Sequence, residues 1–279
     1  MNESTNELDF TSLTMIEDVK REAVRLAFHE YRAWTISILI VGLFFIYLFP
    51  PVVVVIFVWA GYIYSKAHKS FMQQFARCAN MTYTDSIEMH EVKGRLFDLG
   101  HSNRISNVIS GMYEGHAVRL FNYTYTIGSG KHKTTYHFTV HEVSFDKTQF
   151  PYILLQSRTM SKYAWIDMTG NKDIEIKLEE EFKDAFRLFA KENYEIEILE
   201  IFTPEVLHFL KDDAPQYSIE FAENRLYVYD NTFVSTKSAL VRMHDVVKRI
   251  VSSLGPRLER MHDDFSALHE YYGDDRKMS

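Results

Sequence analysis

Residues 33–65, AWTISILIVGLFFIYLFPPVVVVIFVWAGYIYS, decide the organisation of this chain of 279 residues. The segment contains no Asp, Glu, Lys or Arg, although these residues make up 25% of the sequence. As a single helix it would be about 50 Å long, well beyond the roughly 30 Å hydrocarbon core of a bilayer. The Pro50-Pro51 pair lies in the middle, where proline removes a backbone donor and clashes with the preceding turn. We therefore predict two helices that fold back on each other as a transmembrane hairpin.

The residues around this segment predict its orientation. Basic side chains occur on both sides of it, whereas the tip at residues 49–51 has none: Lys20, Arg21, Arg25, Arg32, Lys66, Lys69 and Arg77. The excess of positive charge at both ends predicts a multi-pass protein of the cytoplasmic membrane with both termini in the cytosol. Tryptophans near the two basic ends fit an aromatic belt at one membrane interface. The predicted membrane-interface residues are Trp34, Pro50, Pro51, Trp59 and Lys66.

Two alternatives to a fully spanning hairpin stay open. Each arm would be only about 21–25 Å long, so a re-entrant hairpin that stops short of the far surface also fits. A buried core hairpin of a soluble protein is the third reading. The arms contain no ionisable residue, so nothing in them indicates a transport pathway or a proton relay.

Residues 11–32 precede the hairpin and read as one helix within a cytosolic N-terminal segment, 1–32. Thr14 and Glu17 have the spacing of a capping box. An apolar stripe at helical spacing could lie on the membrane or against a partner. Because the polar face is acidic and would repel anionic lipid, we favour packing on the protein itself, or an extension of the first hairpin arm.

Residues 66–279 predict a cytosolic α+β domain. The first part, 66–80, reads as a helix that continues from the hairpin. Residues 106–145 then alternate with period two, which is typical of an antiparallel β-meander with one buried and one exposed face. Its strands are separated by Glu114-Gly115 and by the turn Gly128-Ser129-Gly130-Lys131. This turn lacks the spacing and the following helix that a phosphate-binding loop requires.

The second half continues the α+β pattern. We expect strands at 152–155 and 174–178, a hairpin over 217–229 that turns at Glu223-Asn224, and C-terminal helices over 236–272. A further helix should begin at Thr203-Pro204, because proline is favoured at the first helical position after a Thr cap.

Two stretches of the sequence resemble a known family. They are ISGMYEGHAVRLFNYTYT, starting at Ile109, and EEEFKDAFRLFAKENYEIEILEIFTPEVLHFL followed by YSIEFAENRLYVYD. With the preceding hairpin, this order is similar to the bacterial membrane-protein family known as Domain of Unknown Function 3137, over roughly residues 30–250. The resemblance implies a membrane protein with a hairpin and an α+β domain, and it implies no activity, cofactor or catalytic residue.

Overall charge and cysteine content exclude several classes of function. The net charge of −7 argues against a nucleic-acid partner, which requires a basic face. A single cysteine, Cys78, allows neither an internal disulfide nor a zinc site of the CxxC type. We interpret Cys78 as a buried thiol, with palmitoylation as the alternative.

Histidines are the strongest candidates for a metal site, although surface histidines are the simpler interpretation. His137 and His141 share a strand, but residues four apart in a strand are about 13 Å apart. A site would need His116 or Glu142 to approach across the sheet. His262 and His269 lie two helical turns apart, which is also too far for one metal. Metal candidates are therefore His116, His137 and His141, and we expect histidines that titrate near a pKa of about 6.5.

Together these features predict a membrane-tethered cytosolic binding or scaffold domain rather than an enzyme. Its expected partner is the lipid bilayer, with a protein partner or self-association as a further possibility, and no cofactor is expected. The alternatives are a membrane-anchored, hydrolase-like enzyme whose site forms no motif, and a hairpin that shapes the bilayer. A deep pocket with converging polar groups would favour the enzyme, and an exposed apolar patch would favour the scaffold.

Overall fold

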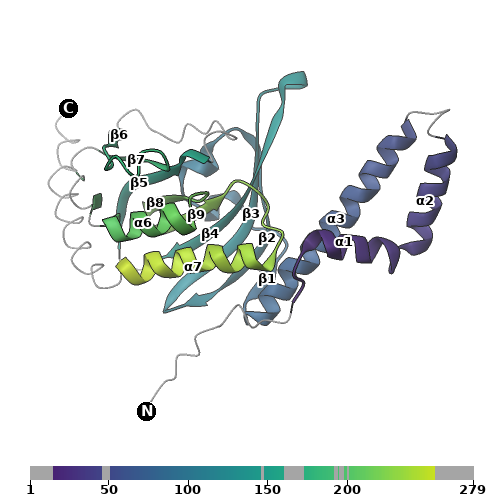
Figure 1. The fold of residues 1–279 in the computed structure, drawn as a ribbon, viewed down its shortest axis with the longest axis horizontal. Coiled ribbons are helices and arrows are strands. Elements are labelled where there is room, and N and C mark those ends of the chain that lie inside the picture. Colours follow the sequence, from purple (N-terminus) through teal and green to yellow (C-terminus); the bar gives the residue numbers. More distant parts are fainter. Residues whose placement is uncertain are drawn as a thin grey trace, which may run out of the picture. The chain divides into compact units, whose positions relative to one another are not determined.

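The computed structural model describes residues 15–45, 51–145, 148–159, 173–191, 194, 198–199 and 201–254. The chain divides into two compact units (Figure 1). The helical unit comprises Met1–Tyr83 with Ser235–Val241, and the sheet unit comprises Thr84–Val234 with Arg242–Ser279. The predicted boundaries at 32 and 65 remain predictions, and helix α3 continues through the second of them.

The first helix of the helical unit, α1, covers Val19–Phe28 and begins at Asp18. The Asp18 carboxylate accepts hydrogen bonds from the backbone nitrogens of Lys20 and Arg21, at 2.6 and 3.2 Å, which is the role of an N-cap. The prediction of one helix over 11–32 is wrong. Residues 17–19 instead bond to the backbone of 235–237, and the chain turns after His29 before α2 starts.

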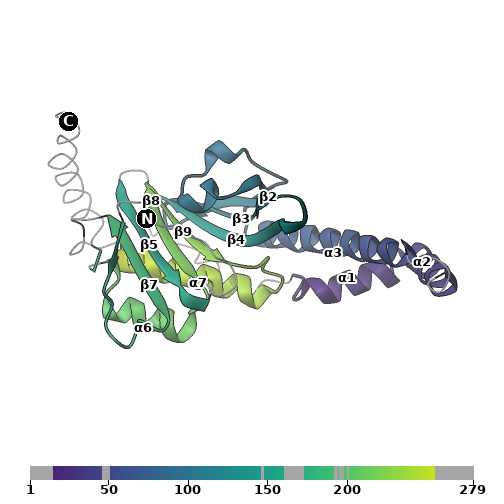
Figure 2. The same cartoon turned by 90° about the horizontal axis from the view of Figure 1, so that it is seen from above.

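Helices α2 (Arg32–Phe45) and α3 (Pro51–Cys78) form the two predicted arms. They lie side by side in the helical unit (Figures 1 and 2), and the tip at 46–50 lies outside the described residues. The expected continuation over 66–80 is confirmed up to Cys78, with Phe71 and Phe75 buried. Among the described residues, no helix combines the length and the apolarity that crossing a membrane requires.

The sheet unit confirms the α+β class and the antiparallel meander. Its nine-stranded sheet has the order β1-β2-β3-β4-β9-β8-β5-β7-β6. The strands are β1 Thr82–Thr84, β2 His101–Tyr113, β3 His116–Ile127, β4 Thr134–Ser144, β5 Phe150–Ser157, β6 Asp173–Ile176, β7 Phe186–Lys191, β8 Ser218–Glu223 and β9 Arg225–Asp230. The helices are α6 Pro204–Asp213 and α7 Lys237–Leu254. Short 3₁₀ turns are η2 Met89–Glu91, η3 Arg95–Asp98 and η4 Gly130–His132.

Most of the turns predicted from sequence are confirmed. Glu114-Gly115 joins β2 to β3, and the stretch at 128–131 joins β3 to β4. Thr203 and Pro204 start α6, and Glu223-Asn224 joins β8 to β9. A helix after 236 is also confirmed as α7, whereas everything predicted beyond 254 lies outside the described residues.

Both faces of the central sheet are covered, so the prediction of one exposed face is wrong. On one face, an aromatic core that includes Tyr123, Phe138 and Tyr227 packs beneath residues 85–100, which we call the strap. On the other face lie α6 and α7, as Figure 2 shows, and Thr139 and His141 are buried there. Period-two alternation separates the two faces of a strand but does not say what covers each of them.

Two glycines in the meander differ in how closely the chain approaches them. Gly100 has φ +62°, and a Cβ there would lie 2.3 Å from the backbone oxygen of Thr126. Gly115, in the turn, has φ +81°, and a Cβ there would meet nothing within 4 Å. Both positions disfavour an L side chain, but only Gly100 also has a backbone atom in the way.

We therefore expect Gly100→Ala to destabilise the protein more than Gly115→Ala. The turn variant should lower the free energy of unfolding by about 1–2 kcal/mol, the left-handed penalty alone. Gly100→Ala should lose at least about 1–3 kcal/mol more, because backbone must move. Urea unfolding of the full chain in neutral detergent micelles, followed by tyrosine and tryptophan fluorescence, measures both. Equal losses would contradict the close approach at Gly100.

Candidate functional site

The structure places the three candidate metal histidines in separate surroundings. The His116 ring packs on Phe145 and the His137 ring on Phe233, with centroids 4.7 and 4.9 Å apart. His141 instead points to α7. Within the part of the chain that the structure describes, no three His, Cys, Asp or Glu side chains gather closely enough to hold a metal ion. His262 and His269 lie outside the described residues.

His141 forms a buried pair with His244 of α7, a residue that the sequence reasoning missed. The His141 Nε2 and His244 Nδ1 atoms are 3.3 Å apart, and Tyr113 packs edge-on against His244. Burial, aided by the neighbouring ring, lowers the pKa of His141 to about 3. Burial, aided by Lys248, lowers the pKa of His244 to about 4. The expected pKa near 6.5 is therefore wrong for His141, and the pair is neutral at pH 7.

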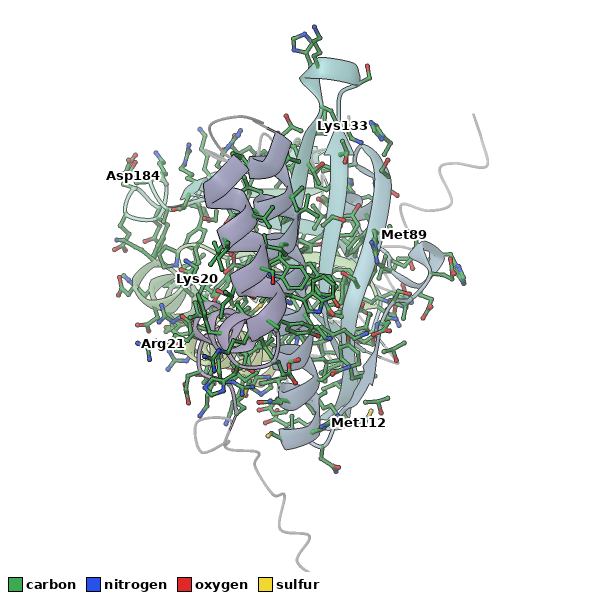
Figure 3. All side chains as sticks on the ribbon, turned by 90° about the vertical axis from the view of Figure 1, so that its right-hand side faces the viewer. Lys20, Arg21, Met89, Met112, Lys133 and Asp184 are labelled. Carbon is green, nitrogen blue, oxygen red and sulfur yellow. The ribbon has the colours of Figure 1, made fainter. Side chains whose placement is uncertain are left out.

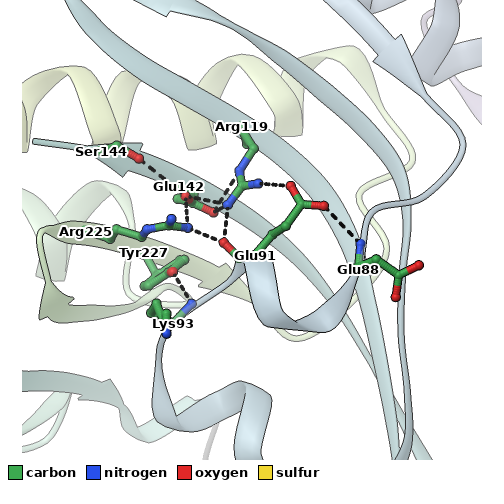
Figure 4. Close-up of polar contacts among 8 residues, drawn as sticks. All are labelled: Glu88, Glu91, Lys93, Arg119, Glu142, Ser144, Arg225 and Tyr227. Atoms are coloured by element: carbon green, nitrogen blue, oxygen red, sulfur yellow. Dashed lines mark hydrogen bonds and ion pairs between the residues drawn. The ribbon is translucent and has the colours of Figure 1, made fainter. Parts of the chain in front are cut away.

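A buried carboxylate lies on the opposite face, under the strap. Glu142 follows His141 and so points the other way. Its side chain is 1% exposed and accepts hydrogen bonds from Arg119 at 2.9 Å and Arg225 at 2.7 Å (Figure 4). Both guanidinium groups also donate to the backbone oxygen of Glu91 in the strap, at 2.9 and 2.6 Å. One buried charge therefore ties strands β3, β4 and β9 to the strap.

Two further contacts fix the strap through its backbone nitrogens. The Lys93 nitrogen donates to the Tyr227 hydroxyl at 2.8 Å (Figure 4), and the Arg95 nitrogen donates to Glu220 Oε1 at 2.7 Å. Glu220 also accepts a short hydrogen bond from the Tyr229 hydroxyl. Burial raises the pKa of Glu220 to about 7, although these hydrogen bonds oppose the rise. The side chains of Lys93 and Arg95 take no part in these bonds, whereas Leu96 and Phe97 of the strap pack into the core.

A cavity of about 1130 Å³ lies between the strap and the ends of strands β5, β7 and β8. Its size is at the upper end of small-molecule sites. Buried residues form its floor, among them Val92, Phe150, Tyr152 and Ala222, and charged residues form its rim, namely Lys93, Arg95, Asp98, Lys191 and Glu223. An apolar floor with a few polar groups is the usual composition of a binding site.

The helical unit groups two of the predicted membrane-interface residues, Trp59 and Lys66, with two tyrosines. Trp59 donates from Nε1 to Thr35 Oγ1 at 3.3 Å and stacks on Tyr62. The Lys66 ammonium donates to the Tyr31 hydroxyl and lies 4.9 Å from the centroid of that ring. We call residues Tyr31, Trp59, Tyr62 and Lys66 the collar.

The remaining predicted interface residues are Trp34, Pro50 and Pro51. Trp34 is exposed on α2, and Pro51 is the first residue of α3. Pro50 lies outside the described residues. Cys78 ends α3 half-buried, and its acylation remains a prediction.

The histidine pair makes stability sensitive to acid. Both pKa values are depressed in the folded state, so the unfolded chain binds more protons at pH values between about 4 and 6.5. The contribution of the pair to stability is therefore full above pH 6.5 and falls on acidification, by up to about 1.4 kcal/mol per pH unit for each histidine. Unfolding of the double variant His141→Leu, His244→Leu should depend less on pH over this range. His137→Leu, which removes an exposed ring, should keep the pH dependence of the parent, and a double variant that also keeps it would contradict the assignment.

The buried carboxylate should matter far more than an exposed one. Glu142→Gln removes the buried counter-charge of two largely buried guanidinium groups and leaves Arg119 only the more exposed Glu91 carboxylate, so it should cost about 3 kcal/mol of unfolding free energy. Its matched control is Glu175→Gln, which breaks an exposed pair with Arg187 and should cost at most about 1 kcal/mol. Hydrogen exchange should also speed up at the strap amides in the first variant alone. Similar losses in the two variants would refute the role given to Glu142.

Comparisons with known proteins give one likeness in fold. No family model matches the sequence, and no curated protein matches it. Among solved structures, the chain is similar to the crystal structure of the mycobacterial trehalose monomycolate transport factor A, TtfA, with a TM-score of 0.52. The match covers 67% of this chain and 94% of that chain at 11% sequence identity. At this identity the likeness shows a shared fold.

Proposed function

We propose that this protein is a membrane-tethered binding or scaffold protein. In this proposal the α2–α3 hairpin inserts into the cytoplasmic membrane, both termini lie in the cytosol, and the sheet unit carries the binding site. The observation that carries the proposal is the apolar surface of the hairpin, which the helical unit leaves exposed.

Large apolar side chains are exposed on both arms. Ile40 is 61% exposed, and on α3 the exposed fractions of Val54, Phe57 and Val58 are 61%, 73% and 66%. A helix that is apolar all round is stable when it is buried in a protein core or a membrane. Each such side chain contributes roughly 1.5–3 kcal/mol when it is removed from water, so insertion into lipid is strongly favoured.

The collar fits the level of the lipid head groups. Trp59 and Tyr62 combine apolar rings with polar tips, and Lys66 holds its charge among their rings. Such residues are enriched where the hydrocarbon core meets water. The exposed Lys20 and Arg21 of α1 (Figure 3) add the positive charge expected on the cytosolic side.

The likeness in fold supports a role connected with lipid transport. TtfA is named as a transport factor for trehalose monomycolate, and we extend to this chain only the class of task, assistance in moving a lipid-like molecule. The resemblance of the sequence to Domain of Unknown Function 3137 is part of the same proposal, because that family consists of membrane proteins.

Charge placed on the hairpin tests the tether. The double variant Phe57→Lys, Val58→Lys should lose membrane association, because a lysine at the centre of a bilayer costs about 2.5–3.5 kcal/mol. Met112→Lys, on an exposed apolar residue of the sheet unit, should behave like the parent. The measurement is the fraction of full chain that floats with membranes after carbonate extraction. A parent that carbonate removes, or a double variant that floats equally well, would refute the tether.

A further inference from the structure

We propose that the cavity beneath the strap binds an amphiphile with an anionic head group and a single apolar chain. The inference rests on the proposed function in one respect, since it names the ligand class for the binding site of a lipid-handling protein.

The floor of the cavity suits an apolar chain. Val92, Phe150, Tyr152 and Ala222 are between 5% and 8% exposed, and all four line the cavity. Neighbouring side chains of the same sheet, such as Leu154, are fully buried. The small exposed area of the floor residues therefore faces the cavity. An apolar ligand in the cavity would remove this area from water.

The rim supplies the positive charge. Lys93 reaches the cavity from the strap and Lys191 from the end of β7. Neither ammonium group has an ion-pair or hydrogen-bond partner among the residues that the structure describes. Two lysines on separate elements thus line one cavity, and within the described part of the chain neither would break a contact on binding an anionic group.

Arg95 adds a positioned donor between floor and rim. Its guanidinium carbon lies 3.4 Å from the centroid of the Tyr152 ring, so the planar group stacks on a floor residue. Its backbone nitrogen is held by Glu220, which fixes where the side chain starts. A stacked guanidinium presents its N–H groups sideways, in the geometry that carboxylate and phosphate oxygens accept.

The net charge of the rim is opposite in sign to the net charge of the whole chain. Asp98 and Glu223 also line the cavity, so among the described lining residues three permanent cations face two carboxylates. The chain as a whole has a net charge of −7. A net positive rim above an apolar floor therefore selects an anionic head over a cationic one, and the shared chemistry covers both carboxylate and phosphate heads.

A displacement titration tests the ligand class. The full chain in nanodiscs of neutral phosphatidylcholine is saturated with the fluorescent probe 11-(dansylamino)undecanoic acid, and empty nanodiscs give the background. Three competitors share one chain length and differ in head group: dodecyl phosphate, dodecyl maltoside and dodecyltrimethylammonium. Dodecyl phosphate should displace the probe at a concentration about tenfold lower than either of the others, the effect of one charge-assisted contact.

Matched variants locate the binding at the cavity. Lys93→Gln, Arg95→Gln and Lys191→Gln together should weaken probe binding at least about tenfold and abolish the preference for phosphate. The control variant removes the same number of positive charges at exposed positions elsewhere, through Lys131→Gln, Lys133→Gln and Lys177→Gln. It should leave the affinity for the probe and the preference for phosphate unchanged.

Each outcome decides the proposal. Equal displacement by the three heads, a preference for the cation, or equal binding in the two triple variants would overturn it. Thermal melts of both triple variants identify any loss that comes from unfolding. If the melt of the rim variant collapses, Lys191→Gln alone, on an exposed side chain, replaces it. Failure of the tether is distinguishable, because a chain that carbonate removes from membranes can still bind the probe with the expected preference.

Discussion

The sheet unit depends on how one buried carboxylate is neutralised. Glu142 is almost fully removed from water, and a carboxylate in that position is tolerated only when cations and hydrogen bonds compensate it. Arg119 and Arg225 provide both, from the strands on either side of β4. Each arginine has further donors, and the backbone oxygen of Glu91 accepts from both. The position of the strap over the sheet therefore follows from satisfying a single charge.

The cavity is a consequence of that position. Once the strap is held at Glu91, its next residues bond to Tyr227 and Glu220 through backbone nitrogens. The strap then lies next to the ends of strands β5 and β8, and the floor of the cavity between them stays partly exposed. The strap therefore carries both the polar contacts that attach it to the sheet and residues that line the cavity. The helical unit contributes a different property, an apolar hairpin with exposed side chains on both arms.

Local signals explain what the sequence could predict. Period-two alternation and the turn at Glu114-Gly115 predicted the meander, and Thr203-Pro204 predicted the start of α6. The turn at 128–131 joins β3 to β4 and sets their register, so the Arg119–Glu142 pairing could have been counted from it. The His141–His244 pair could not, because it depends on how α7 packs on a distant strand. The start of α1 was missed for a similar reason, since pairing with residues 235–237 decides it.

The polar contacts of the strap are made through its backbone, at the Glu91 oxygen and the nitrogens of Lys93 and Arg95, while its Leu96 and Phe97 side chains pack into the core. Main-chain atoms are common to all residues except proline, which lacks the donor. Most substitutions along the outward side of the strap would therefore leave its attachment intact. Gly94 is an exception, because its φ of +145° and its closeness to Glu220 disfavour a side chain. A protein built in this way can acquire a new ligand preference by point mutation in one short segment, while the fold that presents the segment stays the same.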